Sequence, residues 1–223
     1  MDSIKTDIRK YFKAHSDPEN ARNMKAYMRD QFEFFGLKSP VRRVLSSHLW
    51  KNYKDEIIKN WKELVEYLWN QEEREHQHLG MDLMVKIKRH MRQEDLIFIE
   101  SLITRRSWWD TVDLIAAHHV GNLLSKDKAF QLDKAEEYIS SDNMWIQRTA
   151  ILFQLSYKDN TDEKLLYSLI DRCRGSKEFF INKACGWALR QYSKFRPESV
   201  RKYIDSRREH LAGLTIREGS KYL

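Results

Sequence analysis

Two adjacent tryptophans and two aspartates stand together near the middle of the chain, in the run Ser-Trp-Trp-Asp-Thr-Val-Asp at residues 107–113. Ser107 followed by Asp110 has the pattern of a capping box, so we expect a helix to begin at Ser107. In that helix Trp109 and Asp113 are four residues apart and share one surface. An indole face beside a carboxylate could stabilise a cationic reactant. The alternative, from residue types alone, is that the tryptophans fill a core and Asp113 faces water.

The composition indicates a helical protein that would carry this pair. Glycine and proline are scarce, with 7 and 3 residues in 223, and charged residues make up 33%, which favours long helices over strands. Apolar residues recur at helical spacing along most of the chain. We expect an N-terminal helix, a second from residue 17 to 36, and a third from residue 39. Further helices are expected over residues 54–69, 72–90, 93–104, 107–124, 127–140, 142–157, 161–173, 176–192 and 197–210, with a short one from residue 215.

The predicted helices pair, and the pairs repeat every 35 residues. A shift of this length lays residues 140–148 over 175–183 and Tyr157 over Tyr192. A fixed period in this range is typical of stacked helical pairs, none of which can bury its apolar face alone. We therefore predict an all-α fold, an alpha-alpha superhelix of HEAT-like repeats with a concave basic groove. No linker-like stretch divides the chain, so we expect a single domain over residues 1–223.

The same period predicts which side chains share a face. Positions 78, 113, 148 and 183 are equivalent and hold His78, Asp113, Arg148 and Lys183. Lys183, Trp187 and Arg190 fall at i, i+4 and i+7 of one helix, which adds a second indole to this surface. The result would be a groove with a carboxylate, two indoles and flanking cations. The alternative is an exposed ion pair from Asp113 to Arg148 that holds neighbouring repeats in register.

The charge and the termini limit the function classes. A net charge of +7 suits a polyanionic partner, because lysine and arginine release counterions from phosphates on binding. Charge alone also fits solvated helix faces in a protein that binds no nucleic acid. The N-terminus has no signal-like apolar segment, and no apolar run reaches the roughly 18 residues of a membrane span. We therefore expect a cytoplasmic protein with no membrane partner.

The cysteines and histidines do not have the spacing of a metal site. Cys173 and Cys185 form no CxxC motif, so buried thiols are expected. Histidines occur at positions 76, 78, 118 and 119, and none of these pairs has the i, i+4 spacing that places two imidazoles on one helical face. No glycine-rich phosphate loop is evident. The sequence predicts no metal and no cofactor.

Three motifs in order make the chain recognisable. They are SWWDTVD at residues 107–113, SDNMWIQR at 141–148, and SKEFFI at 176–181 continuing to GWALR at 186–190. Through them the chain resembles the AlkD-like DNA alkylation repair family, from the first helix to the last. The resemblance implies a HEAT-like superhelix and a monofunctional DNA glycosylase of base excision repair. Its substrates would be N3- and N7-alkylated purines, such as 3-methyladenine and 7-methylguanine, in double-stranded DNA.

The resemblance also assigns roles to residues. It implies that Trp109, Asp113 and Trp187 form the catalytic cleft and that Arg148 contacts the DNA backbone beside the lesion. An alkylated purine is cationic and leaves a sugar with oxocarbenium character, which a carboxylate and two π faces can stabilise. The family is thought to leave the damaged nucleotide in the duplex, whereas most glycosylases extrude it.

The remaining candidates are contacts to the DNA backbone. They are Lys183 and Arg190, and near the N-terminus Tyr27, Lys38, Ser39 and Arg43. Lys38 occupies a position that is often glutamine in the family, which favours a phosphate contact over an uncharged one. Tyr27 could equally be a core aromatic. We expect the protein to act as a monomer on duplex DNA.

Two other functions remain open from the sequence. One is a DNA-binding relative without glycosylase activity, recognising bent or branched DNA, in which Arg148 and Lys183 matter and Asp113 is dispensable. The other is a protein-binding solenoid in which the tryptophans anchor a peptide.

Overall fold

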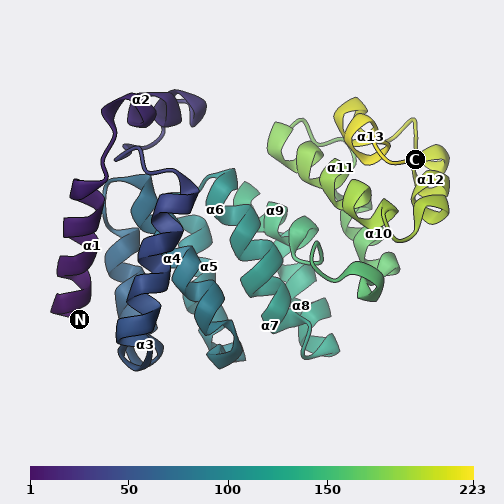
Figure 1. Cartoon of the computed structure of the whole chain (residues 1–223). Coiled ribbons are helices and arrows are strands. Elements are labelled where there is room, and N and C mark those ends of the chain that lie inside the picture. The colour runs from purple at the N-terminus through teal and green to yellow at the C-terminus, as the bar shows by residue number, and fades with distance from the viewer. The chain divides into compact units, whose positions relative to one another are not determined.

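A computed structural model describes all residues 1–223 and divides into two compact units, Met1–Met91 and Arg92–Leu223. Every regular element is a helix, and the isolated bridge between Glu33 and Glu73 is the one extended pairing. The predicted all-α fold is therefore confirmed (Figure 1). The single domain over residues 1–223 stays a prediction. None of the helices combines the length and the apolar character needed to cross a bilayer.

The first unit contains α1 (Asp2–Ala14), α2 (Pro18–Tyr27), α3 (Ser39–Trp69) and α4 (Arg74–Ile87), followed by a 3-10 turn at Lys88–His90. Two boundaries differ from the sequence prediction. The helix expected to reach residue 36 ends at Tyr27, because Arg29 and Asp30 take positive φ angles of 55° and 57°. The helices expected from residue 39 and over 54–69 form one element, α3, with kinks at Tyr53 and Asn60.

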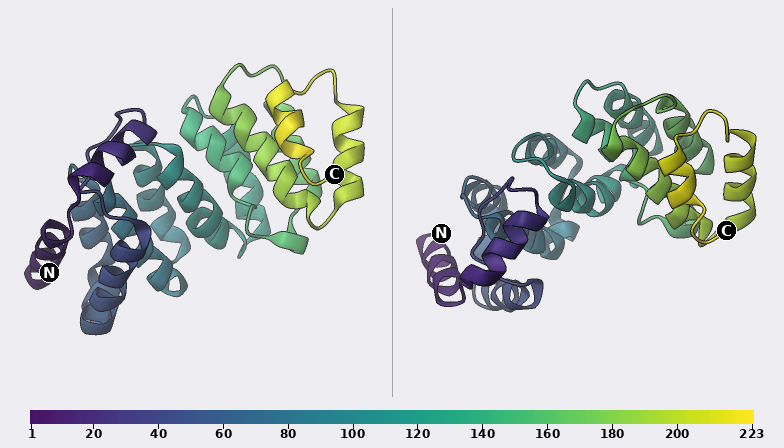
Figure 2. Two further views of the ribbon diagram at one scale, coloured as in Figure 1. Left: turned by 45° about the horizontal axis from the view of Figure 1, so that its top comes forward. Right: turned by 90° about the horizontal axis from the view of Figure 1, so that it is seen from above.

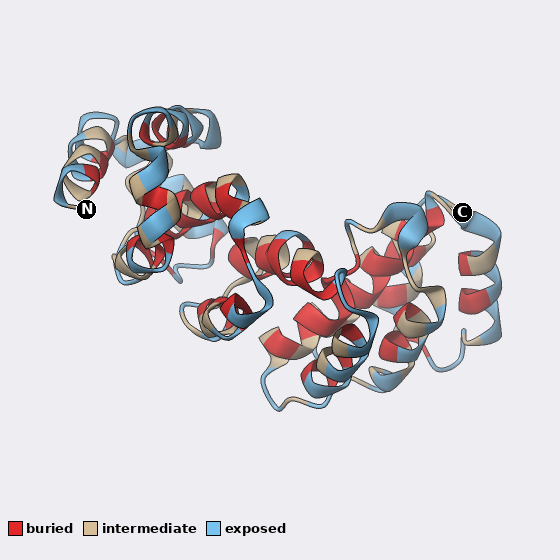
Figure 3. Ribbon diagram, turned by 90° about the horizontal axis from the view of Figure 1, so that it is seen from below, coloured by how far each residue is buried: buried red, intermediate tan, exposed pale blue.

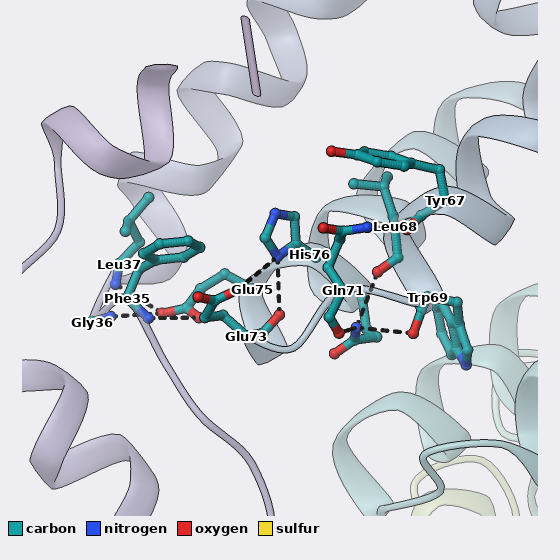
Figure 4. Close-up of polar contacts among 11 residues, drawn as sticks. Phe35, Gly36, Leu37, Tyr67, Leu68, Trp69, Gln71, Glu73, Glu75 and His76 are labelled. Atoms are coloured by element: carbon teal, nitrogen blue, oxygen red, sulfur yellow. Dashed lines mark hydrogen bonds and ion pairs between the residues drawn. The ribbon is translucent and has the colours of Figure 1, made fainter. Parts of the chain in front are cut away.

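A buried carboxylate fixes the loop between α2 and α3 (Figure 4). The Glu75 side chain accepts hydrogen bonds from the backbone N–H groups of Phe35, Gly36 and Leu37, at 3.1, 2.8 and 3.0 Å. Gly36 has φ of 90°, and a Cβ there would lie 2.1 Å from the carbonyl oxygen of Asp17. Only glycine fits this turn. The loop so held leads directly into Lys38 and Ser39 at the start of α3.

The second unit is built from two layers of helices. One layer contains α5 (Leu96–Thr104), α8 (Lys128–Ile139), α10 (Glu163–Arg172) and α12 (Pro197–Ser206). The other contains α6 (Trp109–Leu114), α9 (Met144–Leu152), α11 (Phe179–Ser193) and α13 (Gly213–Gly219). In this second layer α6 packs on α9, α9 on α11 and α11 on α13, and the last three lie side by side in Figure 2. We call it the site layer, because every candidate site residue of this unit belongs to it.

Packing between the layers supplies the core of the second unit. Buried positions gather on the helix sides that face each other, and exposed positions lie on the outer sides (Figure 3). Buried residues such as Leu102, Val112, Leu152 and Leu189 are 0% exposed. Burying such a side chain contributes on the order of 1.5 to 3 kcal/mol. The apolar side chains whose spacing predicted the helices therefore also stabilise the packing of the two layers.

The helix with the double tryptophan begins at Trp109, so the capping box predicted at Ser107 is wrong. The Ser107 hydroxyl donates to the carbonyl of Ile103 at 2.6 Å instead of accepting from the new helix. Trp108 takes an extended conformation, with φ of −157°, and serves as the N-cap. The helix then continues through a π-helical turn at Ile115–Val120 into α7 (Gly121–Leu124). Because the start moves by two residues only, Asp113 still lies in this helix.

Candidate active site

Trp109, Asp113 and Trp187 line one open cleft of about 400 Å³ in the second unit. Trp109 and Asp113 come from α6 and Trp187 comes from α11, which are separated along the site layer by α9. Both indoles are partly exposed, so neither is sealed in the core. The structure therefore brings together the three side chains to which the resemblance assigns catalysis.

The two adjacent tryptophans have different surroundings. Trp108 packs against Trp145 and Phe180, with ring centroids 5.8 and 5.3 Å away, in an aromatic cluster that does not line the cleft. Trp109 faces the cleft. All three rings of this cluster are half-buried, as Trp109 is, so the alternative that the tryptophans only fill a core holds for neither Trp108 nor Trp109.

Asp113 is held by a bidentate ion pair with Arg148 of α9. Nε of Arg148 donates to Oδ1 at 2.7 Å and Nη2 donates to Oδ2 at 2.8 Å, while Nη1 donates to the carbonyl of Phe180. The ion pair considered as an alternative from the sequence therefore exists, but it is buried, with side-chain exposures of 12% for Asp113 and 3% for Arg148. Each carboxylate oxygen can accept a second hydrogen bond, so the pair leaves acceptor capacity on Asp113.

Burial dominates the electrostatics of this carboxylate. Desolvation raises the pKa of Asp113, the hydrogen bonds and charge of Arg148 lower it, and nearby Asp110 raises it, with a net upward shift. Arg148 is so enclosed that its clearest role here is to orient Asp113. Contact of Arg148 with a DNA backbone stays a prediction.

Lys183 and Arg190 flank Trp187 on α11 and share a partner that the sequence did not reveal. Lys183 Nζ lies 2.8 Å from Glu218 Oε1, and Arg190 Nη1 lies 2.9 Å from Glu218 Oε2. Glu218 is on α13 and is 4% exposed. The two cations are thus brought together on one carboxylate beside the cleft.

The other predicted backbone contacts lie in the first unit. Tyr27 at the end of α2 is 71% exposed, which excludes the core alternative for its ring. Lys38, Ser39 and Arg43 are exposed at and near the start of α3. His78, which shares their unit, is half-buried in α4.

Further residues line the cleft that the sequence did not indicate as site residues. They are Asp110, Leu114, Ala117, His118, Leu155, Ser156 and Gln191. Gln191 follows Trp187 by four positions, so helical spacing could have identified it. His118 lies within the π-helical segment Ile115–Val120 and follows the lining residue Leu114 by four positions, so the same spacing could have identified it.

Comparisons with known proteins identify the family of the chain. Residues 8–223 match the family described as DNA alkylation repair enzyme. A solved structure of a predicted DNA alkylation repair enzyme from Enterococcus faecalis is similar, with 33% identity, a TM-score of 0.85, and coverage of 93% of this chain and 96% of that one. The crystal structure of smu.31 from Streptococcus mutans UA159 has a TM-score of 0.57 at 15% identity, covering 82% of this chain and 99% of that one, and shares the fold alone. No curated protein matches the chain. The match over residues 8–223, together with the similarity to the Enterococcus faecalis protein, leads to one conclusion: the chain belongs to the DNA alkylation repair enzyme family.

Proposed function

We propose that the protein is a monofunctional DNA glycosylase that hydrolyses the N-glycosidic bond of cationic N3- and N7-alkylated purines in duplex DNA. The observation that carries the proposal is the cleft in which one buried, oriented carboxylate and two indoles converge. Membership of the repair family supports DNA as the partner. The protein acts as a monomer on DNA that contains 3-methyladenine or 7-methylguanine.

The chemistry follows from the charge of the substrate. The bond from C1′ to the purine nitrogen breaks, and its electron pair neutralises the cationic base, which leaves. A water molecule adds to C1′ and gives up a proton, so the products are the free alkylated base and an abasic site. The Asp113 carboxylate stabilises the positive charge that develops on the sugar and orients the water. Because burial raises its pKa, this carboxylate is also a better proton acceptor than an exposed aspartate.

The two indoles make the cleft selective for cationic lesions. Trp109 and Trp187 present π faces to the charged base and sugar, and each desolvated contact of this kind is worth about 1 to 2 kcal/mol, or roughly tenfold in rate. Such contacts do not require the base to leave the helix, which supports a reaction on a nucleotide that stays in the duplex. Neutral lesions gain little from this arrangement and react poorly.

A base-release assay tests the proposal. Purified protein is incubated with duplex DNA carrying 7-methylguanine or 3-methyladenine, and with a matched duplex carrying uracil as a neutral lesion. We expect release of the methylated purines, no release of uracil, and loss of activity in Asp113→Asn. Binding of the methylated duplex without base release would instead support the non-catalytic DNA-binding alternative. Release that does not depend on Asp113 would reject the mechanism.

A further inference from the structure

Three cations surround one buried carboxylate where α13 packs on α11. Glu218, which is 4% exposed, forms ion pairs with Lys183 at 2.8 Å, Arg190 at 2.9 Å and Lys221 at 2.9 Å. The hydrogen bonds from Lys183 and Lys221 lower the pKa of Glu218 to about 2, so it stays ionised at neutral pH. Three positive charges and one negative charge leave the cluster with a net charge of +2.

The cluster lies beside the cleft because of the helical geometry of α11. At about 100° per residue, Lys183, Trp187 and Arg190 lie within roughly 60° of one another on the helix surface. Gly186 precedes Trp187, and a Cβ there would lie 2.5 Å from Cβ of Glu218 and 2.9 Å from the carbonyl of Thr215. The glycine therefore lets α13 approach closely enough to bring Glu218 to both cations. On the surface of α11, Lys183 and Arg190 therefore lie between the side that faces α13 and the Trp187 indole that lines the cleft.

The three cations retain donors for a further ligand. An ammonium has three N–H groups and a guanidinium has five, and each cation contacts Glu218 through one nitrogen. Their side chains are 37%, 23% and 46% exposed for Lys183, Arg190 and Lys221. Convergent donors with a net charge of +2 fit the oxygens of a phosphodiester. In a DNA strand a phosphodiester adjoins every deoxyribose, including one placed on Trp187.

We propose that Lys183, Arg190 and Lys221 form a clamp for one phosphodiester of the DNA strand whose sugar lies on Trp187, and that Glu218 is the positioning residue of this clamp. The proposal rests on the proposed function for the presence of DNA, but the clamp requires no base release. Glu218 keeps long, flexible side chains convergent, and so reduces the conformational entropy that phosphate binding must overcome.

The salt dependence of binding to an undamaged duplex tests the clamp. The logarithm of the affinity falls with the logarithm of the salt concentration by about 0.9 for each phosphate neutralised on B-DNA. We expect the double variant Lys183→Ala/Arg190→Ala to lower this slope by about 0.9. The control is Arg201→Ala/Lys202→Ala, which removes two exposed cations from α12 and should leave the slope unchanged. The single-phosphate clamp is overturned if the salt slope of the first variant is unchanged or falls by about 2 or more. It is also overturned if the slope of the control falls equally.

A second variant tests the positioning role of Glu218. Glu218→Gln keeps the size of the side chain and raises the net charge by one, so long-range attraction alone predicts tighter binding. The clamp predicts binding about tenfold weaker, because the cations lose their shared anchor. Asp171→Asn is the control: its charge change is the same, Asp171 pairs with Arg207 in the other layer, and binding should not weaken. Thermal unfolding verifies that both variants are folded, and unchanged or tighter binding by Glu218→Gln overturns the role.

These measurements separate the clamp from the glycosylase. A protein that releases no methylated base but shows the expected changes in binding keeps the clamp and loses the proposed function. A protein that releases base while both binding tests fail keeps the proposed function and loses the clamp.

Discussion

Arg148 donates to both carboxylate oxygens of Asp113 across a sequence separation of 35 residues, which is the length of one repeat. Lys183 and Glu218 form the next ion pair along the site layer with the same separation. Positions 113, 148, 183 and 218 therefore form one column of charged residues through α6, α9, α11 and α13. The column links the stacking of repeats to the orientation of the candidate catalytic carboxylate.

The first prediction concerns the charge of Asp113. Asp113→Asn keeps the shape of the side chain and removes the charge that stabilises the developing sugar cation. We expect base release to slow by about 100-fold or more, and binding to methylated duplex to change by less than about threefold. Single-turnover release of 7-methylguanine measures the first effect and a binding titration measures the second.

Asp110→Asn is the matched control, because Asp110 also lines the cleft, one turn earlier on α6. We expect its effect on the rate to be smaller than about tenfold. Equal losses in the two variants would mean that the total charge of the cleft matters, and not the carboxylate that Arg148 orients.

The second prediction concerns pH. The ionised form of Asp113 is required, and burial raises its pKa above the ordinary aspartate value of about 3.9. Activity is therefore lost as the pH falls through this raised pKa, at a higher pH than for an exposed aspartate. In Arg148→Gln the residue that lowers the pKa of Asp113 is gone, so the acid limb of kcat/KM moves to still higher pH. An acid limb that stays in place would show that Arg148 does not tune Asp113.

The third prediction concerns stability. Removing one member of a buried ion pair leaves the other charge without compensation, so Arg148→Gln should lower the free energy of unfolding by about 3 to 5 kcal/mol. Asp113→Asn in the same background should restore part of this loss, because it removes the stranded charge. The exposed pair of Arg196 and Asp159, with side chains 53% and 62% exposed, is the control. Arg196→Ala should cost less than about 1 kcal/mol in denaturant unfolding.

Helical spacing and the 35-residue period predicted which side chains of the candidate site lie close together. Helical spacing placed Trp109 beside Asp113, and the 35-residue period placed Arg148 opposite that carboxylate. The same period extends from Lys183 to Glu218, but the short last helix gave too little pattern to show it. Burial of the ion pair could not be foreseen, since it depends on how α6, α9 and α11 pack in three dimensions.

Other features of the site depend on single residues. His118 follows the lining residue Leu114 by four positions, so helical spacing places it on the same side, and it lines the cleft from within the π-helical segment Ile115–Val120. The capping box failed because Ser107 donates to the carbonyl of Ile103 in the preceding helix. A serine hydroxyl can bond either to the preceding helix or to the N-terminus of the next one, and the sequence pattern does not reveal which bond forms.

The fourth prediction concerns the two indoles. Trp109→Ala and Trp187→Ala should each slow release of cationic purines by roughly 10- to 30-fold through loss of a cation–π contact. Trp187→Phe should retain part of the rate, since a benzene ring keeps a weaker π face. Trp145→Phe is the control: Trp145 packs against Trp108 and Phe180 and does not line the cleft. If this control slows release as much as the cleft variants do, the tryptophans act through packing.

The fifth prediction concerns the first unit. Lys38 and Arg43 are exposed at the start of α3, in the segment that follows the loop held by Glu75. If both contact phosphates, Lys38→Ala and Arg43→Ala should weaken binding to damaged and undamaged duplexes equally, and each should lower the salt slope by about 0.9. Lys51→Ala and Lys59→Ala remove the same charge from exposed positions farther along α3 and should leave the slope unchanged. Equal salt slopes for all four variants would show that the basic residues of α3 act only through the overall charge of the protein. Lys38 and Arg43 would then not contact DNA phosphates.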